Sequence, residues 1–140
     1  MAQATTTILV NGETSLVRVD LLSDGSGELT NFVVLNPSDL LNTATNTQPM
    51  FRIMQIWYSM VWFDVTVGVG TLQPSPLWTL ARDTAPNYDF RSFGGLVDYA
   101  QTPAIDENGE LWISTNGFTT AGSIGNIILE LRKTYISTPK

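Results

Sequence analysis

The stretch that decides the fold is FRIMQIWYSMVWFDVTVGVG, residues 51–70, which is the most apolar part of the chain. Every second residue from Val61 to Val69 is apolar, and Asp64 and Thr66 lie between them. Because successive side chains of a strand point to opposite faces, this period of two predicts a half-buried strand over residues 61–69. The sequence also predicts a strand over residues 51–58 and leaves open whether the residues between the two strands turn or merely bend the chain.

Outward from this centre, further short apolar runs are separated by turn signals. The predicted strands cover residues 5–10, 16–22, 32–35, 77–81, 111–113 and 127–135. Asn11-Gly12 is typical of a two-residue hairpin turn, and Ser38 or Asp39 could cap one helical turn through Leu41. About eight short strands predict an all-β chain, a single antiparallel β-sandwich that is jelly-roll-like. The order of the strands stays open.

Composition narrows the possible functions. The length fits one domain, so residues 1–140 are predicted to form a single β-sandwich domain. The chain has neither cysteine nor histidine, which removes disulfides, thiolate metal sites and a Ser-His-Asp triad. A net charge of −6 without a basic cluster argues against nucleic acid as a partner. The N-terminus does not have the pattern of a signal peptide, and no apolar run approaches the ~20 residues of a membrane span, so we expect no membrane partner.

The low charge suggests how the surface is used. Charged residues make up 14% of the chain, against a usual share of about 25%. Much of the surface must therefore be neutral and polar, and such a surface is buried in an assembly at lower cost than a charged one.

The loop LLSDGSGELT, residues 21–30, is the most site-like local pattern. Asp20, Asp24 and Glu28 could offer oxygens to a hard cation, but their spacing does not match a twelve-residue calcium loop. Two nearby acids repel phosphate, and no helix follows to supply amide dipoles. We interpret the stretch as a hairpin or bulge connection in which Asp24-Gly25 and Gly27 take positive φ. No metal or cofactor is expected.

Three other features have a chemical and a structural interpretation. Asp64 could be one of two carboxylates of a glycosidase, but we interpret it as a polar residue on a half-exposed strand or at an interface. Residues 90–96, FRSFGGL, share a glycine pair with nucleotide loops, and we interpret the pair as a tight bend or a close packing contact. Large aromatic residues could stack on sugar rings, or belong to the core or an interface. They are Trp57, Trp62, Trp78, Trp112, Tyr58, Tyr88, Tyr99 and Tyr135.

Four segments together resemble a family of small structural proteins from tailed bacteriophages, especially marine and cyanobacterial ones. They are SDGSGE (23–28), FRIMQIWYSMVWFDV (51–65), DFRSFGGL (89–96) and ILELRK (128–133), and their order covers most of the chain. The resemblance implies a non-enzymatic virion protein, in particular a jelly-roll-like decoration (cement) protein on the outside of an icosahedral head. The family has no catalytic residues to transfer to this chain.

The resemblance also implies the partners. We expect a homo-oligomer, a trimer, that binds the major capsid protein on the outer capsid surface after synthesis in the host cytoplasm. The N-terminal arm, residues 1–10, is uncharged and rich in threonine, so it is expected to contact a neighbour by strand addition or by lying on the capsid. Exposed aromatics flanking the glycines of residues 90–96 form the second expected contact. The candidate interface residues are Thr5, Thr6, Thr7, Phe90, Arg91 and Phe93.

Two alternatives stay open. One is a β-domain of a tail, spike or head fibre that binds host glycans. The other is a glycan hydrolase that uses two carboxylates. Head or tail position, copy number and host are not predicted.

Overall fold

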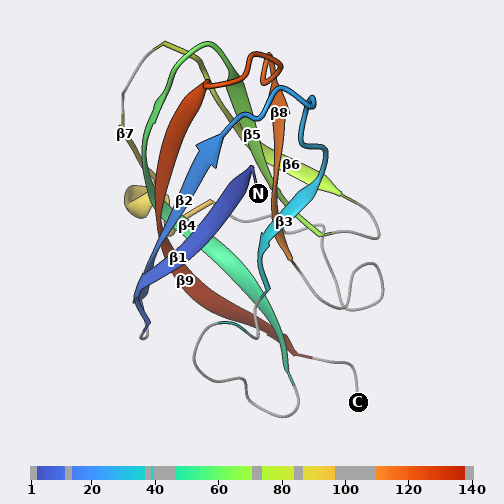
Figure 1. The fold of residues 1–140 in the computed structure, drawn as a ribbon. Coiled ribbons are helices and arrows are strands. Elements are labelled where there is room, and N and C mark those ends of the chain that lie inside the picture. The colour runs from blue at the N-terminus through green and yellow to red at the C-terminus, as the bar shows by residue number, and fades with distance from the viewer. Residues whose placement is uncertain are drawn as a thin grey trace.

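The computed structural model describes residues 3–11, 14–36, 39, 47–70, 74–83, 87–96 and 110–137. Within them the chain forms two antiparallel sheets that pack face to face (Figure 1). The predicted all-β sandwich is confirmed. In spatial order, the first sheet contains β1 (Ala4–Val10), β2 (Thr14–Leu22), β9 (Ile124–Ser137), β4 (Thr47–Met60) and β7 (Asn87–Asp89). The second contains β3 (Phe32–Leu35), β8 (Leu111–Asn116), β5 (Asp64–Val69) and β6 (Ser75–Leu80).

The pairing of the strands defines a jelly roll. β2 pairs with β9, β3 with β8, β4 with β7 and β5 with β6, all antiparallel. This is the pattern of one long hairpin whose two arms run side by side from β2 and β9 to the β5–β6 turn. When this hairpin wraps around the core, β4 comes to lie beside β9 and β5 beside β8, and these strands pair as well. Two Greek keys of this kind make the eight-stranded jelly roll, and β1 adds one further strand beside β2.

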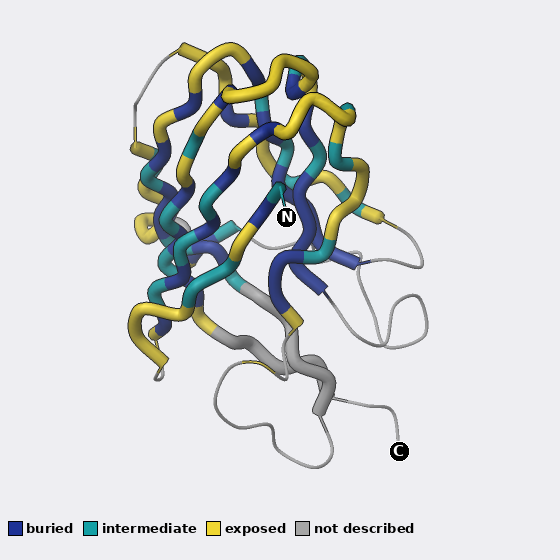
Figure 2. The backbone as a smooth tube through the Cα atoms, in the orientation of Figure 1, coloured by how far each residue is buried: buried dark blue, intermediate teal, exposed yellow. Residues whose placement is uncertain are grey.

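Buried and exposed residues alternate along several of the described strands (Figure 2), and the buried apolar residues form the core. In β2, Val17, Val19 and Leu21 are at most 2% exposed, whereas Arg18 and Asp20 lie on the outer face. The predicted alternation is confirmed. Val65, Val67 and Val69 of β5 complete the opposite wall, with exposure of at most 1%. The sandwich is therefore held by two apolar inner faces, which is the usual arrangement for packed sheets.

The predicted strand over residues 61–69 begins too early. β4 ends at Met60 and β5 starts at Asp64, and these strands belong to different sheets. The chain crosses between the sheets at residues 61–63, so Val61 is 40% exposed and does not enter the core. The alternation of apolar residues can continue through a crossing segment when the strands on both sides of it have an apolar inner face. For this reason the sequence does not reveal where one strand ends and the next begins.

Other boundaries differ in smaller ways. The structure adds the three-residue strand β7, extends β9 to fourteen residues and extends β8 to Asn116. In the predicted helical turn, Asp39 accepts a hydrogen bond from the Asn36 amide at 2.8 Å, whereas Ser38 and Leu41 lie outside the described residues. Gly12 of the predicted Asn11-Gly12 turn lies outside them as well.

Candidate interaction surface

The acidic loop after β2 is a structural connection. Gly25 and Gly27 have φ of 83° and 126° as predicted, whereas Asp24 does not have positive φ. The hairpin interpretation is wrong, because β2 and β3 lie in different sheets and the loop links them. The Asp24 carboxylate accepts a hydrogen bond from the Ser26 amide at 2.9 Å, and hydrogen bonds from Ser26 lower the pKa of Asp24. These contacts are typical of an Asx turn.

Glu28 reaches from this loop to the loop after β8. Its two carboxylate oxygens accept hydrogen bonds from the Gly117 amide at 2.7 Å and the Phe118 amide at 2.6 Å. Asp20 instead pairs with Arg18 at 3.0 Å. The three acids considered as cation ligands thus have separate partners. In the described part of the chain, no three Asp, Glu, His or Cys residues are grouped as metal ligands would be.

Asp64 forms a clamp with Arg82. The guanidinium nitrogen Nη2 of Arg82 lies 3.1 Å from Asp64 Oδ2, and the Arg82 amide donates to Asp64 Oδ1 at 2.7 Å. The hydrogen bond from the Arg82 side chain lowers the pKa of Asp64. Arg82 also donates to the carbonyl oxygens of Trp62 at 3.1 Å and Asn116 at 3.0 Å. Asp64 is therefore a half-exposed residue held in place by Arg82, in agreement with its interpretation as a polar residue on a half-exposed strand.

Four aromatic residues close one side of the sandwich. Trp78 on β6 meets Tyr88 on β7 and the following Phe90 edge to face, with ring centroids 5.3 and 5.1 Å apart. Tyr88 stacks on Tyr58 of β4. Because β6 and β7 are the edge strands of the two sheets, the cluster fills the gap between them. Its members serve as core and edge packing.

This packing corrects one expected contact. Phe90 is 3% exposed, so the expectation of an exposed aromatic at this position is wrong. Arg91 is exposed and lies 2.7 Å from Asp89, and its hydrogen bond lowers the pKa of Asp89 to about 2. The side chain of Phe93 lies outside the described part of the structure, as do those of Tyr99 and Tyr135.

The glycine pair of residues 90–96 makes a tight bend, as predicted. Gly94 ends the short 3-10 turn η2 (Arg91–Phe93) with φ of 84°. Gly95 has φ of 97°, and an added Cβ would lie 2.8 Å from the Met54 sulfur. Leu96 then exchanges backbone hydrogen bonds with Ile53 at 2.9 and 2.7 Å. The loop therefore packs closely against β4.

The predicted N-terminal arm is the edge strand β1 over its described residues. Thr5, Thr6 and Thr7 pair with β2, and Ala4 is buried. The Gln3 side chain accepts a hydrogen bond from the Asp24 amide at 2.9 Å, which fixes the start of the strand. Thr5 is exposed, whereas Thr6 and Thr7 are half-exposed. A contact through these threonines stays a prediction.

The exposed apolar residues lie mainly in two groups, at the two ends of the β1–β2 pair. Nine large apolar residues are exposed in the described part of the chain. Three of them, Ile8, Leu9 and Val10, form what we call the tip cluster at the end of β1. Four others form what we call the end patch: Leu22, Val61, Trp62 and Ile124. Leu22 pairs with Ile124, and the Val61 amide donates to the Ile124 carbonyl at 3.1 Å, which brings these three residues together, while Trp62 follows Val61 in the chain.

Trp62 has a strained backbone. Its φ is 74°, which is a rare conformation for a bulky residue and costs on the order of 1–3 kcal/mol. Two neighbours hold it there: Asp83 accepts a hydrogen bond from the Trp62 amide at 2.9 Å, and Arg82 donates to its carbonyl. The Trp62 residue is nevertheless 58% exposed. The fold thus holds Trp62, a large apolar residue, in a conformation that leaves it exposed to solvent.

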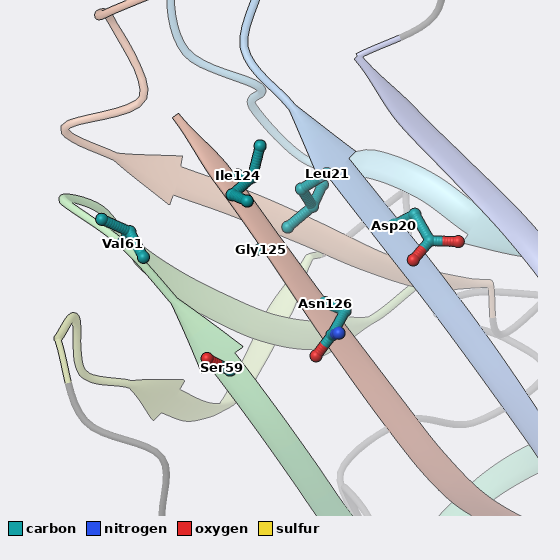
Figure 3. Close-up of a pocket in the computed structure, with 7 residues that line it drawn as sticks. All are labelled: Asp20, Leu21, Ser59, Val61, Ile124, Gly125 and Asn126. Atoms are coloured by element: carbon teal, nitrogen blue, oxygen red, sulfur yellow. The ribbon is translucent and has the colours of Figure 1, made fainter. Parts of the chain in front are cut away.

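A shallow depression lies beside the end patch on the outer face of the first sheet. Its volume is about 310 Å³, and it is lined by Asp20, Leu21, Ser59, Val61, Ile124, Gly125 and Asn126. Figure 3 shows Val61 and Ile124 toward the end of the sheet, and Asp20, Ser59 and Asn126 in a row across β2, β4 and β9. Sequence reasoning missed this surface because it placed Val61 on the core face of a strand. The one available signal was the undecided turn near Ser59 and Met60.

Comparisons with protein-family models, with curated proteins and with solved structures found no match for this chain. Among the described residues, no helix is long and apolar enough to cross a membrane.

Proposed function

We propose that the chain is a non-enzymatic virion structural protein, a decoration protein that binds the outer surface of an icosahedral phage head and stabilises it. The resemblance of residues 23–28, 51–65, 89–96 and 128–133 to small phage structural proteins leads to this proposal. The jelly-roll fold is in keeping with it, because capsid proteins commonly use such folds.

The observation that carries the proposal is the character of the surface. Only 14% of the residues are charged, and the tip cluster and end patch together hold seven of the nine large apolar residues found exposed in the described part of the chain. Soluble monomers rarely expose contiguous apolar patches larger than roughly a few hundred Å², and larger patches commonly mark contacts with other proteins. A homotrimer that also contacts the major capsid protein would cover these surfaces. Many symmetry-related copies would then restrain the shell through multivalency.

A reconstruction of the virion that contains this chain tests the proposal. We expect copies on the outside of the head in numbers close to those of the major shell subunit. A few copies at one vertex would instead support a tail role, and absence from purified virions would refute the proposal.

A paired set of variants tests the contact through β1. Thr5 and Thr7 lie on the outer face of β1, opposite Asp20 and Arg18, so Thr5→Glu with Thr7→Glu adds charge without removing the buried Ala4. We expect lower occupancy on heads for this double variant. Thr119→Glu, in the exposed loop after β8, is the matched control and should leave occupancy unchanged.

The second candidate is a β-domain of a tail, spike or head fibre that binds host glycans. The depression favours it, because Asp20, Ser59 and Asn126 are side-chain types that hydrogen-bond sugar hydroxyls. Binding on a glycan array that is lost in Asn126→Ala would support this candidate. Absence of binding across the array would count against it.

A further inference from the structure

The dipeptide Asn-Gly occurs three times in the chain, at residues 11–12, 108–109 and 116–117. An asparagine before glycine can lose ammonia without an enzyme, because glycine has no Cβ to shield its amide nitrogen. Of the three pairs, Asn116-Gly117 has both residues in the described part of the chain. Asn116 is the exposed last residue of β8, and Gly117 is half-exposed with φ of 92°. Water therefore reaches this pair.

Deamidation at such a pair has two steps. In the first, hydroxide removes the proton of the Gly117 amide, and the nitrogen attacks Cγ of Asn116. An N–Cγ bond forms while the Cγ–Nδ2 bond breaks, and ammonia leaves after taking a proton from water, so that a cyclic imide remains. In the second, water opens the imide at either carbonyl carbon and gives aspartate or isoaspartate. Nothing is oxidised or reduced, and water is the one co-reactant.

Both polar groups of the reacting peptide are held in the folded chain. The Gly117 amide donates a hydrogen bond to Glu28 Oε2 at 2.7 Å, and the Asn116 carbonyl oxygen accepts one from Arg82 Nη2 at 3.0 Å. Because a peptide unit is planar, its N–H and C=O turn together. The Gly117 nitrogen can face Cγ of Asn116 only after this unit rotates away from the extended conformation of β8. That rotation breaks both hydrogen bonds.

The two side chains that hold the peptide are themselves fixed. Glu28 Oε1 accepts hydrogen bonds from the Phe118 amide at 2.6 Å and the Thr115 hydroxyl at 3.2 Å. The Arg82 guanidinium is bound to Asp64 at 3.1 Å. Movement of one side chain therefore does not free the peptide, because the other side chain still holds it.

The Glu28 carboxylate also acts on the chemistry of the nitrogen. A negative charge beside an acidic N–H disfavours loss of the proton, since the anion that forms is repelled. A carboxylate is also far too weak a base to remove the proton of a backbone amide by itself. Contact with Glu28 should therefore slow the first step at Gly117 rather than catalyse it.

We propose that Asn116-Gly117 is a latent deamidation site, which its hydrogen bonds with Glu28 and Arg82 keep closed in the folded chain. The reaction then proceeds through local openings that release this peptide. Its rate reports how firmly the loop after β8 is held. The inference concerns the chain by itself and does not depend on the proposed function.

The product would weaken the contacts that restrain the reaction. Asn116 lies opposite Asp64 in the β5–β8 pair, and like charges directly opposite each other on paired strands are destabilising. A carboxylate formed at position 116 would also compete with Asp64 for Arg82. Isoaspartate adds one carbon to the main chain, which displaces Gly117 from Glu28. A single event should thus loosen this end of the sandwich irreversibly.

Peptide mapping by mass spectrometry, on the purified full chain kept at mildly alkaline pH, tests the proposal. Residue 116 should deamidate at least about tenfold more slowly in the native chain than in the same chain unfolded in urea. Glu28→Gln should raise the native rate at residue 116 by about 10- to 100-fold, the factor to which a hydrogen bond to a charged group converts. Because Oε1 of Glu28 accepts from two donors, the glutamine oxygen is expected to stay there and to leave its NH2 group against the Gly117 amide.

The chain supplies its own controls. The pairs at residues 11–12 and 108–109 are internal references, and their rates should be the same in Glu28→Gln and in the unmodified chain. Ile127→Val controls for a general loss of stability, because it removes one methylene from a fully buried position and leaves Glu28 and Arg82 in place. This variant should not change the rate at residue 116.

Equal rates at residue 116 in the native and the unfolded chain would overturn the inference. An unchanged or slower rate in Glu28→Gln would do the same, as would an equal acceleration in Ile127→Val, which would assign the reaction to global unfolding. Circular dichroism must show that each variant folds.

A second variant keeps the test decisive if Glu28→Gln unfolds. Arg82→Lys keeps a positive charge beside Asp64 but removes the planar group that reaches the Asn116 carbonyl. It should raise the rate at residue 116, whereas Arg91→Lys, at an exposed pair with Asp89, should not. Hydrogen exchange of the Gly117 amide is a readout independent of deamidation, and its protection should fall in Arg82→Lys. Unchanged protection together with an unchanged rate would contradict the proposal.

Discussion

The carboxylate of Glu28 accepts a hydrogen bond from the Phe118 amide at 2.6 Å, across 90 residues of sequence. Phe118 is fully buried, and its ring lies 4.7 Å from that of Phe63 between centroids. The loop between β2 and β3 thus fixes the loop after β8, and with it an aromatic pair of the core. One exposed acid therefore links the two arms of the long hairpin that wraps into the jelly roll.

Replacing Glu28 with glutamine should weaken this link. The amide keeps one acceptor oxygen but places an N–H donor opposite the backbone amide of Gly117 or Phe118, so one hydrogen bond is lost. We expect the free energy of unfolding to fall by about 1–2 kcal/mol, measured by urea denaturation. Asp24→Asn is the control, because the Asp24 carboxylate bonds within its own turn to Ser26. An equal loss in both variants would contradict the role given to Glu28.

A methyl group at Gly68 should not fit. An added Cβ there would lie 2.5 Å from Cη2 of the Trp112 indole and 2.6 Å from the Ser75 carbonyl oxygen. Gly68→Ala should therefore lower the free energy of unfolding by about 1–3 kcal/mol, which is the usual cost of overpacking.

A double variant tests whether steric crowding by the Trp112 indole causes the loss of stability in Gly68→Ala. Trp112 is 3% exposed, and its indole nitrogen has no hydrogen-bond partner, so Trp112→Phe removes no polar contact. Phenylalanine also lacks the outer ring atoms that approach Gly68. The loss caused by Gly68→Ala should be smaller in a Trp112→Phe background, as a double-mutant cycle would show. Simple additivity would mean that the indole is not what excludes the methyl group.

The Asp64–Arg82 clamp should make stability depend on pH in the acid range. The hydrogen bond from Arg82 holds the pKa of Asp64 below its usual value of 3.8. The contribution is therefore complete above the unfolded-state pKa and is lost as the pH falls through the lower folded-state pKa. Asp64→Asn should lower the melting temperature by a few degrees at neutral pH, and the difference should shrink below about pH 3. A difference that stays constant down to that pH would exclude the charge as its cause.

Alanine substitutions at two neighbouring residues of the FRSFGGL loop should have very different effects on stability. Phe90 is buried between Trp78 and Tyr88, so Phe90→Ala should cost about 3–5 kcal/mol in unfolding free energy. Arg91 is exposed and pairs with Asp89 beside it. Exposed pairs of this kind contribute little, so Arg91→Ala should leave the melting temperature nearly unchanged. Similar losses in the two variants would argue against the packing of Phe90.

Much of the fold could be predicted from sequence, because each inner face carries its own pattern. In β2, the alternation of Val17, Arg18 and Val19 predicts which face of the strand is buried, and the structure confirms that prediction. The glycines of the acidic loop likewise indicated a turn, since positive φ at Gly25 and Gly27 suits glycine. Such signals are local, and they stay valid wherever the strand is placed.

The end patch could not be predicted, because it depends on which strands become neighbours. Leu22, Val61 and Ile124 are far apart in sequence and meet only through the pairing of β2, β9 and β4. The strained conformation of Trp62 depends on Asp83, which comes 21 residues later. The burial of Phe90 likewise requires β6 and β7 to form facing edges. These features arise from tertiary packing, about which a single sequence carries little information.

The length of β4 and β9 has a consequence for how the molecule opens. Both strands have fourteen residues, but β2 accompanies β9 only as far as Arg132, and the described pairing of β4 with β7 covers residues 55–57. Among the strands that the structure describes, residues 47–51 and 133–137 pair only with each other, and an isolated two-stranded ribbon has little stability of its own. Backbone amides there should exchange with deuterium through local fraying, whereas amides near Ile56 and Leu129 should exchange only when the whole sandwich unfolds. These two strands would thus contain both an easily opened part of the described structure, at one end, and a highly protected part, around Ile56 and Leu129.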